Sequence, residues 1–213
     1  MKSLMVVLAL GVLPAFGGNR VAPIRLYVQF QHQPPDAVLE AIQEELENIM
    51  VPAGMAFEWR SLAATQGNEV SVELAVIHFK GSCEASDLAP IEGFPGPLGW
   101  THISDGEILP FSDINCDGIR LFTQRDLLRV PEANRETVYG RAIARVLAHE
   151  LYHIFAKTTK HGSEGVGKPA YSVKELLSDK FQFEKRECNL LRLHEERVAA
   201  VNADPINRDA AGQ

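Results

Sequence analysis

Residues 149–161 of the chain read HELYHIFAKTTKH. The first five residues, His149 to His153, form an HExxH pattern. On a helix, residues four apart lie on one face about one turn from each other, so the imidazoles of His149 and His153 can point at one metal ion. Glu150 lies beside them, where its carboxylate can act on a water bound to that ion. The pattern therefore predicts a Zn²⁺ site with Glu150 as its catalytic base.

The residues before this motif predict a long helix that is buried along one side. After Arg135 the chain continues ETVYGRAIARVLAHELYHIF without a proline, and Asn134 is the expected N-cap. Apolar residues recur there at helical spacing: Ile143, Leu147, Leu151 and Ile154. His149 lies about 200° around the helix from Leu147, at ~100° per residue, so the histidines face away from the apolar stripe. Such a helix is suited to the floor of a metal-binding cleft.

The amino-terminal segment predicts export. Residues 1–17 combine a short basic start, an apolar run from Leu4 to Phe16 and the small residue Gly17, which is the pattern of a secretory signal peptide. The apolar run is too short to span a membrane comfortably. We therefore expect a secreted or periplasmic protein with no stable membrane insertion after signal cleavage. A single domain is expected over residues 18–201, followed by a disordered tail over residues 202–213.

Charge and cysteine content limit the partners and ligands. The formal net charge of the 213 residues is -7, which argues against a nucleic-acid partner. No CxxC spacing occurs, which argues against a zinc site built from cysteines. Cys83 and Cys116 bracket a long irregular middle section, so we expect these two to form a disulfide and Cys188 to stay a free thiol.

Sequence patterns upstream of the motif predict a β-sheet with one helix packed on it. The helix is expected over residues 37–50, capped by Asp36 and closed by Gly54. Strands are expected where β-forming residues alternate with polar ones: 23–30, 55–62, 70–79, 98–104, 107–111 and 119–122. The Asp105-Gly106 pair is the expected turn between two of them. The fold class is therefore α+β, with a twisted mixed sheet.

Downstream of the motif the sequence predicts further helices. Residues 162–169 are rich in glycine and end in proline, so they are expected to be non-helical. Ser172 and Glu175 form an S-x-x-E capping box that predicts a helix over 172–185, and a second helical stretch is expected over 188–201. The carboxy-terminal part is therefore expected to be helical.

Residues 113–118, DINCDG, match the opening of a calcium-binding loop. The EF-hand pattern also needs a bidentate Glu at position twelve, and Gln124 stands there. A turn between two strands explains Asp117-Gly118 more simply. His102, a lone histidine in the same region, is expected to be structural or exposed.

Two residues compete to be the third ligand, because a catalytic zinc takes three protein ligands and leaves one position to water. His161 follows His153 by eight residues, and Gly162 lets the chain turn there. Glu175 and Asp179 have instead the E-x-x-x-D shape of the second helix in thermolysin-like enzymes. We favour His161, because the capping box already explains Glu175. Asp179 is then either a carboxylate that orients a ligand imidazole or a solvated helix position.

The run HELYHIFAKTTKH followed by GSEGVGK resembles the metzincin branch of zinc proteases, whose motif is HExxHxxGxxH followed by a methionine turn. It is closer still to small secreted bacterial zincins. The resemblance implies a zincin-like fold, Zn²⁺ held by His149, His153 and His161, and peptide hydrolysis with Glu150 as general base. The chain departs from the pattern in the longer gap before His161 and in the missing methionine, at whose place Gly167 stands.

These observations predict a secreted zinc metallopeptidase that acts on a peptide or protein substrate. Tyr171 is expected to bond the oxyanion, to be a distant ligand, or to pack at the rim. Residues 98–104 are expected to pair with an extended peptide as an added strand. Two alternatives remain open: an inactive zinc-binding homologue that binds peptides without cleaving them, and a zinc hydrolase of a non-peptide amide.

Overall fold

The computed structural model describes residues 24–67, 69, 71, 73–85, 88, 93 and 96–203. The predicted signal peptide lies outside the described residues, as do residues 204–213 of the predicted tail. Residues 202 and 203, which were also expected to belong to that tail, form the end of the last helix. The domain limits therefore stay a prediction at the amino-terminal end.

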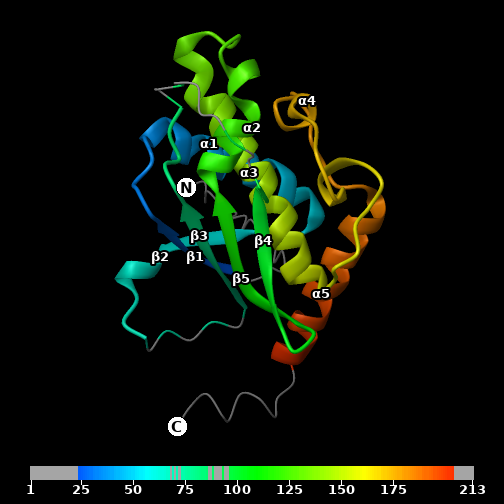
Figure 1. Ribbon diagram of the computed structural model, residues 1–213. Helices are drawn as coiled ribbons and strands as arrows, with labels where there is room; N and C mark the ends of the chain where they lie inside the picture. Colours follow the sequence, from blue (N-terminus) through cyan, green and yellow to red (C-terminus); the bar gives the residue numbers. More distant parts are fainter. Residues whose placement is uncertain are drawn as a thin grey trace, which may run out of the picture.

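One mixed sheet organises the described part of the chain (Figure 1). Its strands are β1 (Ile24–Phe30), β2 (Phe57–Ser61), β3 (Leu74–Lys80), β4 (Gly99–Ser104) and β5 (Glu107–Asn115), in the order β2-β1-β3-β5-β4. The edge strand β4 is antiparallel to β5, and the other pairs are parallel. The predicted α+β class with a mixed sheet is confirmed, and β5 extends four residues beyond its predicted end at Phe111.

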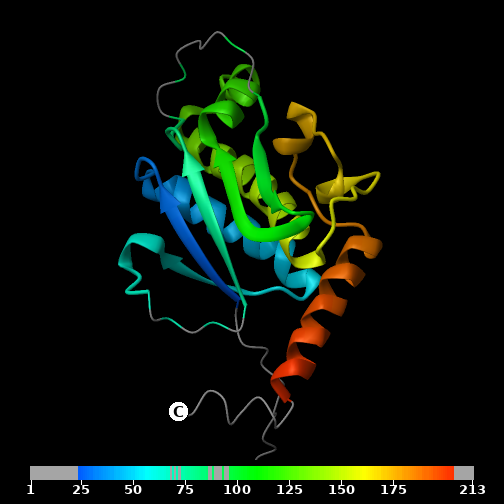
Figure 2. The same ribbon diagram turned by 60° about the horizontal axis from the view of Figure 1, so that its bottom comes forward.

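Helices pack against this sheet and against each other (Figures 1 and 2). The α-helices are α1 (Asp36–Met50), α2 (Cys116–Leu127), α3 (Glu132–Ala156), α4 (Val173–Leu176) and α5 (Lys185–Ala203). Short 3₁₀ turns are η1 (Val51–Ala53), η2 (Leu62–Ala64) and η3 (Gly165–Gly167). The helix α3 carries the HExxH motif and contacts α1, α2, β4, β5 and α5, so the motif is held from several sides.

The apolar stripe predicted on α3 is the centre of the core. Ile143, Leu147, Leu151 and Ile154 are each at most 1% exposed. Full burial of one such side chain contributes about 1.5–3 kcal/mol, so the stripe fixes the rotation of α3 about its axis. Farther up the helix, a Cβ on Gly140 would lie 2.7 Å from both the Val38 carbonyl oxygen and the Ala41 Cβ. The glycine thus lets α1 and α3 approach closely, and α3 is seated with its histidines turned away from the core.

The prediction for residues 113–122 is wrong. The segment is the end of β5 followed by the start of α2, and neither a turn between strands nor a strand over 119–122 forms there. The Asn115 side chain accepts a hydrogen bond of 2.9 Å from the Gly118 amide and so caps α2. Ile119 is buried on the inner side of that helix. A short apolar run fits a strand and a buried helix equally well, so the cap decided the outcome.

Several helix limits also differ from the prediction. Asp36, the expected N-cap of α1, is its first residue after Pro35 and makes no capping hydrogen bond, and α5 begins at Lys185 and not at Cys188. The helix α3 begins at Glu132 after Pro131. Asn134, the expected N-cap, lies in its first turn, where the backbone N–H of Asn134 donates to the Pro131 carbonyl at 2.9 Å. The capping box of Ser172 and Glu175 is present, but α4 ends at Leu176 and does not continue to residue 185.

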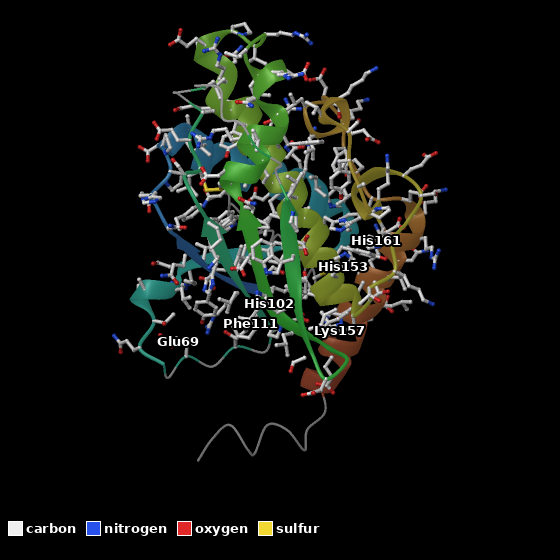
Figure 3. All side chains as sticks on the ribbon, in the orientation of Figure 1. Glu69, His102, Phe111, His153, Lys157 and His161 are labelled. Carbon is white, nitrogen blue, oxygen red and sulfur yellow. A yellow bond between two sulfur atoms is a disulfide. The ribbon has the colours of Figure 1, made fainter. Side chains whose placement is uncertain are left out.

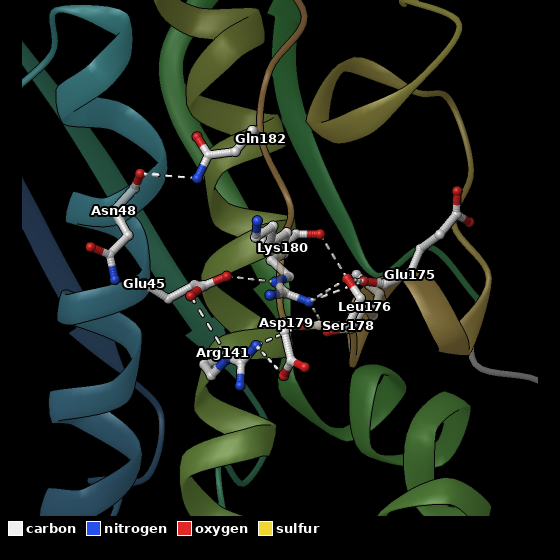
Figure 4. A network of polar contacts seen from close by, with 10 residues as sticks. Glu45, Asn48, Arg141, Glu175, Leu176, Ser178, Asp179, Lys180 and Gln182 are labelled. Carbon is white, nitrogen blue, oxygen red and sulfur yellow. Dashed lines mark hydrogen bonds and ion pairs between the residues drawn. The ribbon is translucent and has the colours of Figure 1, made fainter.

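A buried arginine, Arg145, explains why α4 is so short; its partners Glu45, Glu175 and Leu176 are labelled in Figure 4. Arg145 of α3 is 0% exposed and donates from Nη1 to the carbonyls of Glu175, at 3.0 Å, and Leu176, at 2.8 Å. Its Nε donates to Glu45 Oε1 of α1 at 2.7 Å. These carbonyls are the acceptors that another helical turn would need, so Arg145 ends the helix and ties the segment after it to α1 and α3.

The predicted disulfide between Cys83 and Cys116 is confirmed. It joins the segment after β3 to the first residue of α2, and both cysteines are at most 1% exposed. Cys188 on α5 is free and half-buried, as expected. The bond closes the long segment between the two cysteines into one loop.

Candidate metal centre

The structure brings His149, His153 and His161 together. One ligand atom from each lies within 4.8 Å of the other two, an arrangement that could hold a metal ion. His149 and His153 are each 8% exposed on α3, whereas His161 is exposed. Figure 3 labels His153 on the helix and His161 on the loop that follows it. The helix ends at Ala156, and Lys157 takes the left-handed conformation that turns the chain back toward the two histidines. The ring of His161 lies 5.2 Å from that of His149.

Hydrogen bonds to the backbone fix the tautomers of the two helical histidines. His149 Nδ1 lies 2.8 Å from the Val166 carbonyl oxygen, and His153 Nδ1 lies 2.7 Å from that of Thr158. A carbonyl only accepts hydrogen bonds, so in each ring Nδ1 carries the proton and donates it. Each Nε2 is therefore left with a lone pair, which is the state that a metal ligand needs.

The two Nε2 atoms face each other at 3.0 Å. With both Nδ1 atoms protonated, neither Nε2 has a proton to give, and two lone pairs at this distance repel unless a cation stands near both. Two imidazole nitrogens on a tetrahedral zinc, each at ~2.05 Å, would be about 3.3 Å apart. The donor set and its spacing therefore fit a site that could hold a metal ion.

Burial prepares the imidazoles as neutral ligands. The pKa of His149 is lowered to about 4, mainly by desolvation and to a smaller extent by the nearby His153 and His161, while the hydrogen bond to Val166 acts in the opposite direction. Desolvation also lowers the pKa of His153. Both rings are thus neutral near pH 7, and a metal ion need not displace a proton from them.

Glu150 is buried between α3 and the edge strand β4. It is 5% exposed, and its Oε2 accepts a hydrogen bond of 2.7 Å from Thr101 Oγ1. Ser112 of β5 lies 2.8 Å from the same hydroxyl and completes a short chain of hydroxyl groups. Desolvation raises the pKa of Glu150 to about 7, against which the hydrogen bonds from Thr101 act. A carboxyl with this pKa can take up and release a proton near neutral pH.

The glycine at position 99 sets the clearance of this carboxylate. A Cβ on Gly99 would lie 2.9 Å from Glu150 Oε1 and 2.9 Å from Val146 Cγ1. Such contacts are shorter than carbon and oxygen atoms tolerate, so β4 approaches α3 this closely because it has no side chain there. The close packing of Gly99 thus fixes the position of the Glu150 carboxylate relative to β4.

Glu175, the rejected candidate for third ligand, is committed elsewhere. Its carboxylate forms an ion pair with Lys168, and it accepts from the Ser172 amide at 2.8 Å within the capping box. The hydrogen bond from Lys168 is the main cause that lowers the pKa of Glu175 to about 2. Of the two candidates, the structure places His161 beside His149 and His153.

Asp179 does not orient an imidazole; of the two roles expected for it, the solvated position is the one observed. Its side chain is 101% exposed and lies 3.8 Å from Arg141. The reason is the early end of α4, which swings residues 177–180 out of the helical path and toward α1. Backbone carbonyls take the place of the expected carboxylate at both helical histidines.

Tyr171 lies on the Nδ1 side of His149. Its hydroxyl is 2.8 Å from His149 Nδ1 and donates to the Val166 carbonyl. Burial raises its pKa well above the ordinary value. The Tyr171 hydroxyl therefore contacts the side of the His149 ring that faces away from His153. In this position it acts neither as a metal ligand nor as a donor to an oxyanion.

His102 is structural in the sense expected. Its Nε2 lies 2.8 Å from Asp113 Oδ2, on the neighbouring strand β5, and its side chain is 46% exposed. Thr101, its neighbour, is the residue at the site that sequence reasoning missed. Inward alternation along β4 was the available signal, because Gly99 and Thr101 both face α3. The carbonyls of Thr158 and Val166 carry no such signal, since every residue has one.

Comparison with known proteins assigns no family to the chain. Neither a protein-family model, nor a curated protein, nor a solved structure matches it. Among the described residues, no helix has both the length and the apolar character needed to cross a membrane.

Proposed function

We propose that the protein is an exported zinc-dependent metallopeptidase. The observation that carries the proposal is the pair of facing Nε2 atoms of His149 and His153, 3.0 Å apart with both Nδ1 atoms committed to carbonyls. His161 supplies the third nitrogen, and Glu150 lies on the same helical turn as His149. Three imidazoles with an adjacent carboxylate form the donor set of a hydrolytic zinc site.

The residues divide the chemistry between them. A bound Zn²⁺ would polarise the scissile carbonyl and acidify the attacking water. Glu150 takes the proton of that water as general base and passes it to the leaving amine, for which its raised pKa of about 7 suits it. Thr101 keeps the Glu150 carboxyl in one orientation through its hydrogen bond.

The edge strand supports a peptide as substrate. β4 is the last strand of the described sheet on the side of the site, so one of its edges has no strand partner there. An extended peptide could add to that edge through main-chain hydrogen bonds. Because Gly99 and Thr101 of this strand contact Glu150, a peptide bond held there would lie near the base. This favours peptides over a non-peptide amide.

Export and family likeness remain parts of the proposal. The disulfide between Cys83 and Cys116 is the kind of bond that persists outside a reducing cytosol. The metzincin-like motif supports a zincin-like fold, and the parallel sheet with one antiparallel edge strand is compatible with it. Neither observation identifies a substrate.

A peptide-library cleavage assay on the zinc-loaded protein tests the proposal. Wild type should cleave, and Glu150→Gln should bind as much zinc while losing at least about a hundredfold in kcat. Glu164→Gln, at an exposed loop position near His161, is the matched control and should cleave normally. If loaded wild type cleaves no peptide but binds some of them, the protein is a peptide-binding homologue and the peptidase proposal is wrong.

A further inference from the structure

Glu187, near the start of α5, is a buried acid with an unmet oxygen. The residue is 1% exposed, and its Oε2 is buried without a hydrogen-bond partner. No lysine, arginine or histidine of the described residues forms an ion pair with it. A carboxylate taken out of water in this way is strongly unfavourable unless a cation balances it. The oxygen therefore points to a ligand rather than to a packing role.

The loop that carries His161 wraps closely around this carboxylate. A Cβ on Gly162 would lie 2.4 Å from Glu187 Oε1, and one on Gly167 would lie 3.0 Å from Glu187 Cγ. The loop is closed by a hydrogen bond of 2.7 Å from the Gly162 amide to the Gly167 carbonyl. Figure 2 shows this segment running beside the first turn of α5. The glycines thus let the backbone reach the carboxylate.

A second carboxylate converges on the same place. Glu184 Oε2 lies 3.5 Å from the point where a Cβ of Gly162 would stand, and Ser163 Oγ lies 3.5 Å from Glu184 Oε2. Glu184 is half-buried and Ser163 is exposed, so the group opens to solvent on one side. Two carboxylates and a hydroxyl thus gather at the tip of the loop.

We propose that Glu184 and Glu187, with Ser163, bind a calcium ion against the loop from His161 to Gly167. The group offers oxygen donors only, which select a hard cation over zinc. Its mixture of carboxylate, hydroxyl and water is irregular, which Ca²⁺ tolerates and Mg²⁺ does not. With few protein ligands, we expect a Kd of about 10⁻⁴–10⁻³ M, as in extracellular calcium modules.

Such an ion would join the loop of His161 to α5. The carboxylate of Glu187 lies directly against the backbone of Gly162 and Gly167. A cation bound there would neutralise that charge and attract the loop to α5. A fixed loop would hold His161 in place as a zinc ligand, and this part of the inference rests on the proposed function. Calcium binding itself does not, and it is measured without any substrate.

Calorimetric titration of CaCl₂ into the zinc-loaded full-length protein tests the site. Wild type should bind one Ca²⁺ per chain, and 10 mM CaCl₂ should raise its melting temperature by roughly 3–8 °C. Glu187→Gln should abolish both effects, and Glu184→Gln, which alters only the half-buried rim, should weaken binding at least about tenfold. Glu47→Gln, which removes an exposed carboxylate of α1 outside the loop, is the matched control and should bind as wild type does.

The outcomes separate this inference from the proposed function. Calcium binding by a protein that cleaves nothing would support the site and leave the peptidase proposal to fail alone. If wild type shows neither heat of binding nor a calcium-dependent melting shift, Glu187 is a neutral buried acid and the inference is wrong. Equal binding by Glu187→Gln and wild type would place calcium elsewhere and overturn it as well.

Discussion

The stability of the metal-free protein should respond to pH in opposite ways through Glu150 and His149. Burial raises the pKa of Glu150 from 4.5 to about 7 and lowers that of His149 from 6.5 to about 4. Between pH 4.5 and 7 the folded chain holds the Glu150 proton more tightly than the unfolded chain, so the contribution of Glu150 to the unfolding free energy falls as pH rises. Between pH 4 and 6.5 the unfolded chain holds more protons on His149, so this group gains stability as pH rises.

The size of each effect follows from the shift. Each pKa differs from its ordinary value by about 2.5 units, and one unit corresponds to about 1.4 kcal/mol, so each group contributes about 3 kcal/mol over its window. The two contributions oppose each other between about pH 4.5 and 6.5. The two contributions therefore largely cancel in the wild-type protein, and each is measured separately by replacing one of the two residues.

Urea unfolding in EDTA, followed by circular dichroism from pH 4 to 8, measures these differences. The unfolding free energy of wild type minus that of Glu150→Gln should fall by about 3 kcal/mol as pH rises from 4.5 to 8. Wild type minus His149→Gln should rise by about 3 kcal/mol between pH 4 and 6.5. Glu164→Gln controls for the loss of a carboxylate as such. A change below ~1 kcal/mol in either difference would refute the burial argument for that group.

Three further perturbations test other parts of the structure. Arg145→Met should cost about 3–5 kcal/mol of unfolding free energy, because it removes the buried donor to Glu45 Oε1 and to the carbonyls of Glu175 and Leu176, and leaves Glu45 paired with Arg141 at 3.7 Å. Arg141→Met, at a quarter-exposed position, should cost less than ~1 kcal/mol, and equal losses in urea titrations would contradict the assignment. Gly99→Ala should lower kcat/KM at least about tenfold with zinc content unchanged, because its Cβ displaces Glu150; wild-type kinetics would show that β4 yields instead. Tyr171→Phe should weaken zinc binding by about tenfold or less in competition with a chelator, and a complete loss would mean that Tyr171 is itself a ligand.

Local patterns predicted the parts of the fold that local forces determine. The stripe on α3, the strand β1 and the capping box at Ser172 are each decided by neighbours within a few residues, and all three are observed. The histidine pair is of this kind too, because helical spacing alone brings His149 and His153 together. The third histidine was harder, since its position depends on the turn at Lys157.

Contacts between distant residues decided the rest. Arg145 ends α4 through carbonyls thirty residues away in sequence, and no pattern around Ser172 announces that partner. The groups that orient the imidazoles are main-chain carbonyls at Thr158 and Val166. A carbonyl has no sequence signal, whereas the carboxylate of Asp179 was visible in the sequence and was considered for this role. The buried Glu187 likewise looks like an ordinary helix residue until the loop is folded over it.

Zinc K-edge X-ray absorption of the stoichiometrically loaded protein tests the metal centre most directly. We expect one zinc per chain with three imidazole nitrogens at about 2.0–2.1 Å and one oxygen ligand from water, and two imidazoles in the His161→Ala variant. A spectrum with sulfur ligands, or one that His161→Ala leaves unchanged, would contradict a zinc held by His149, His153 and His161.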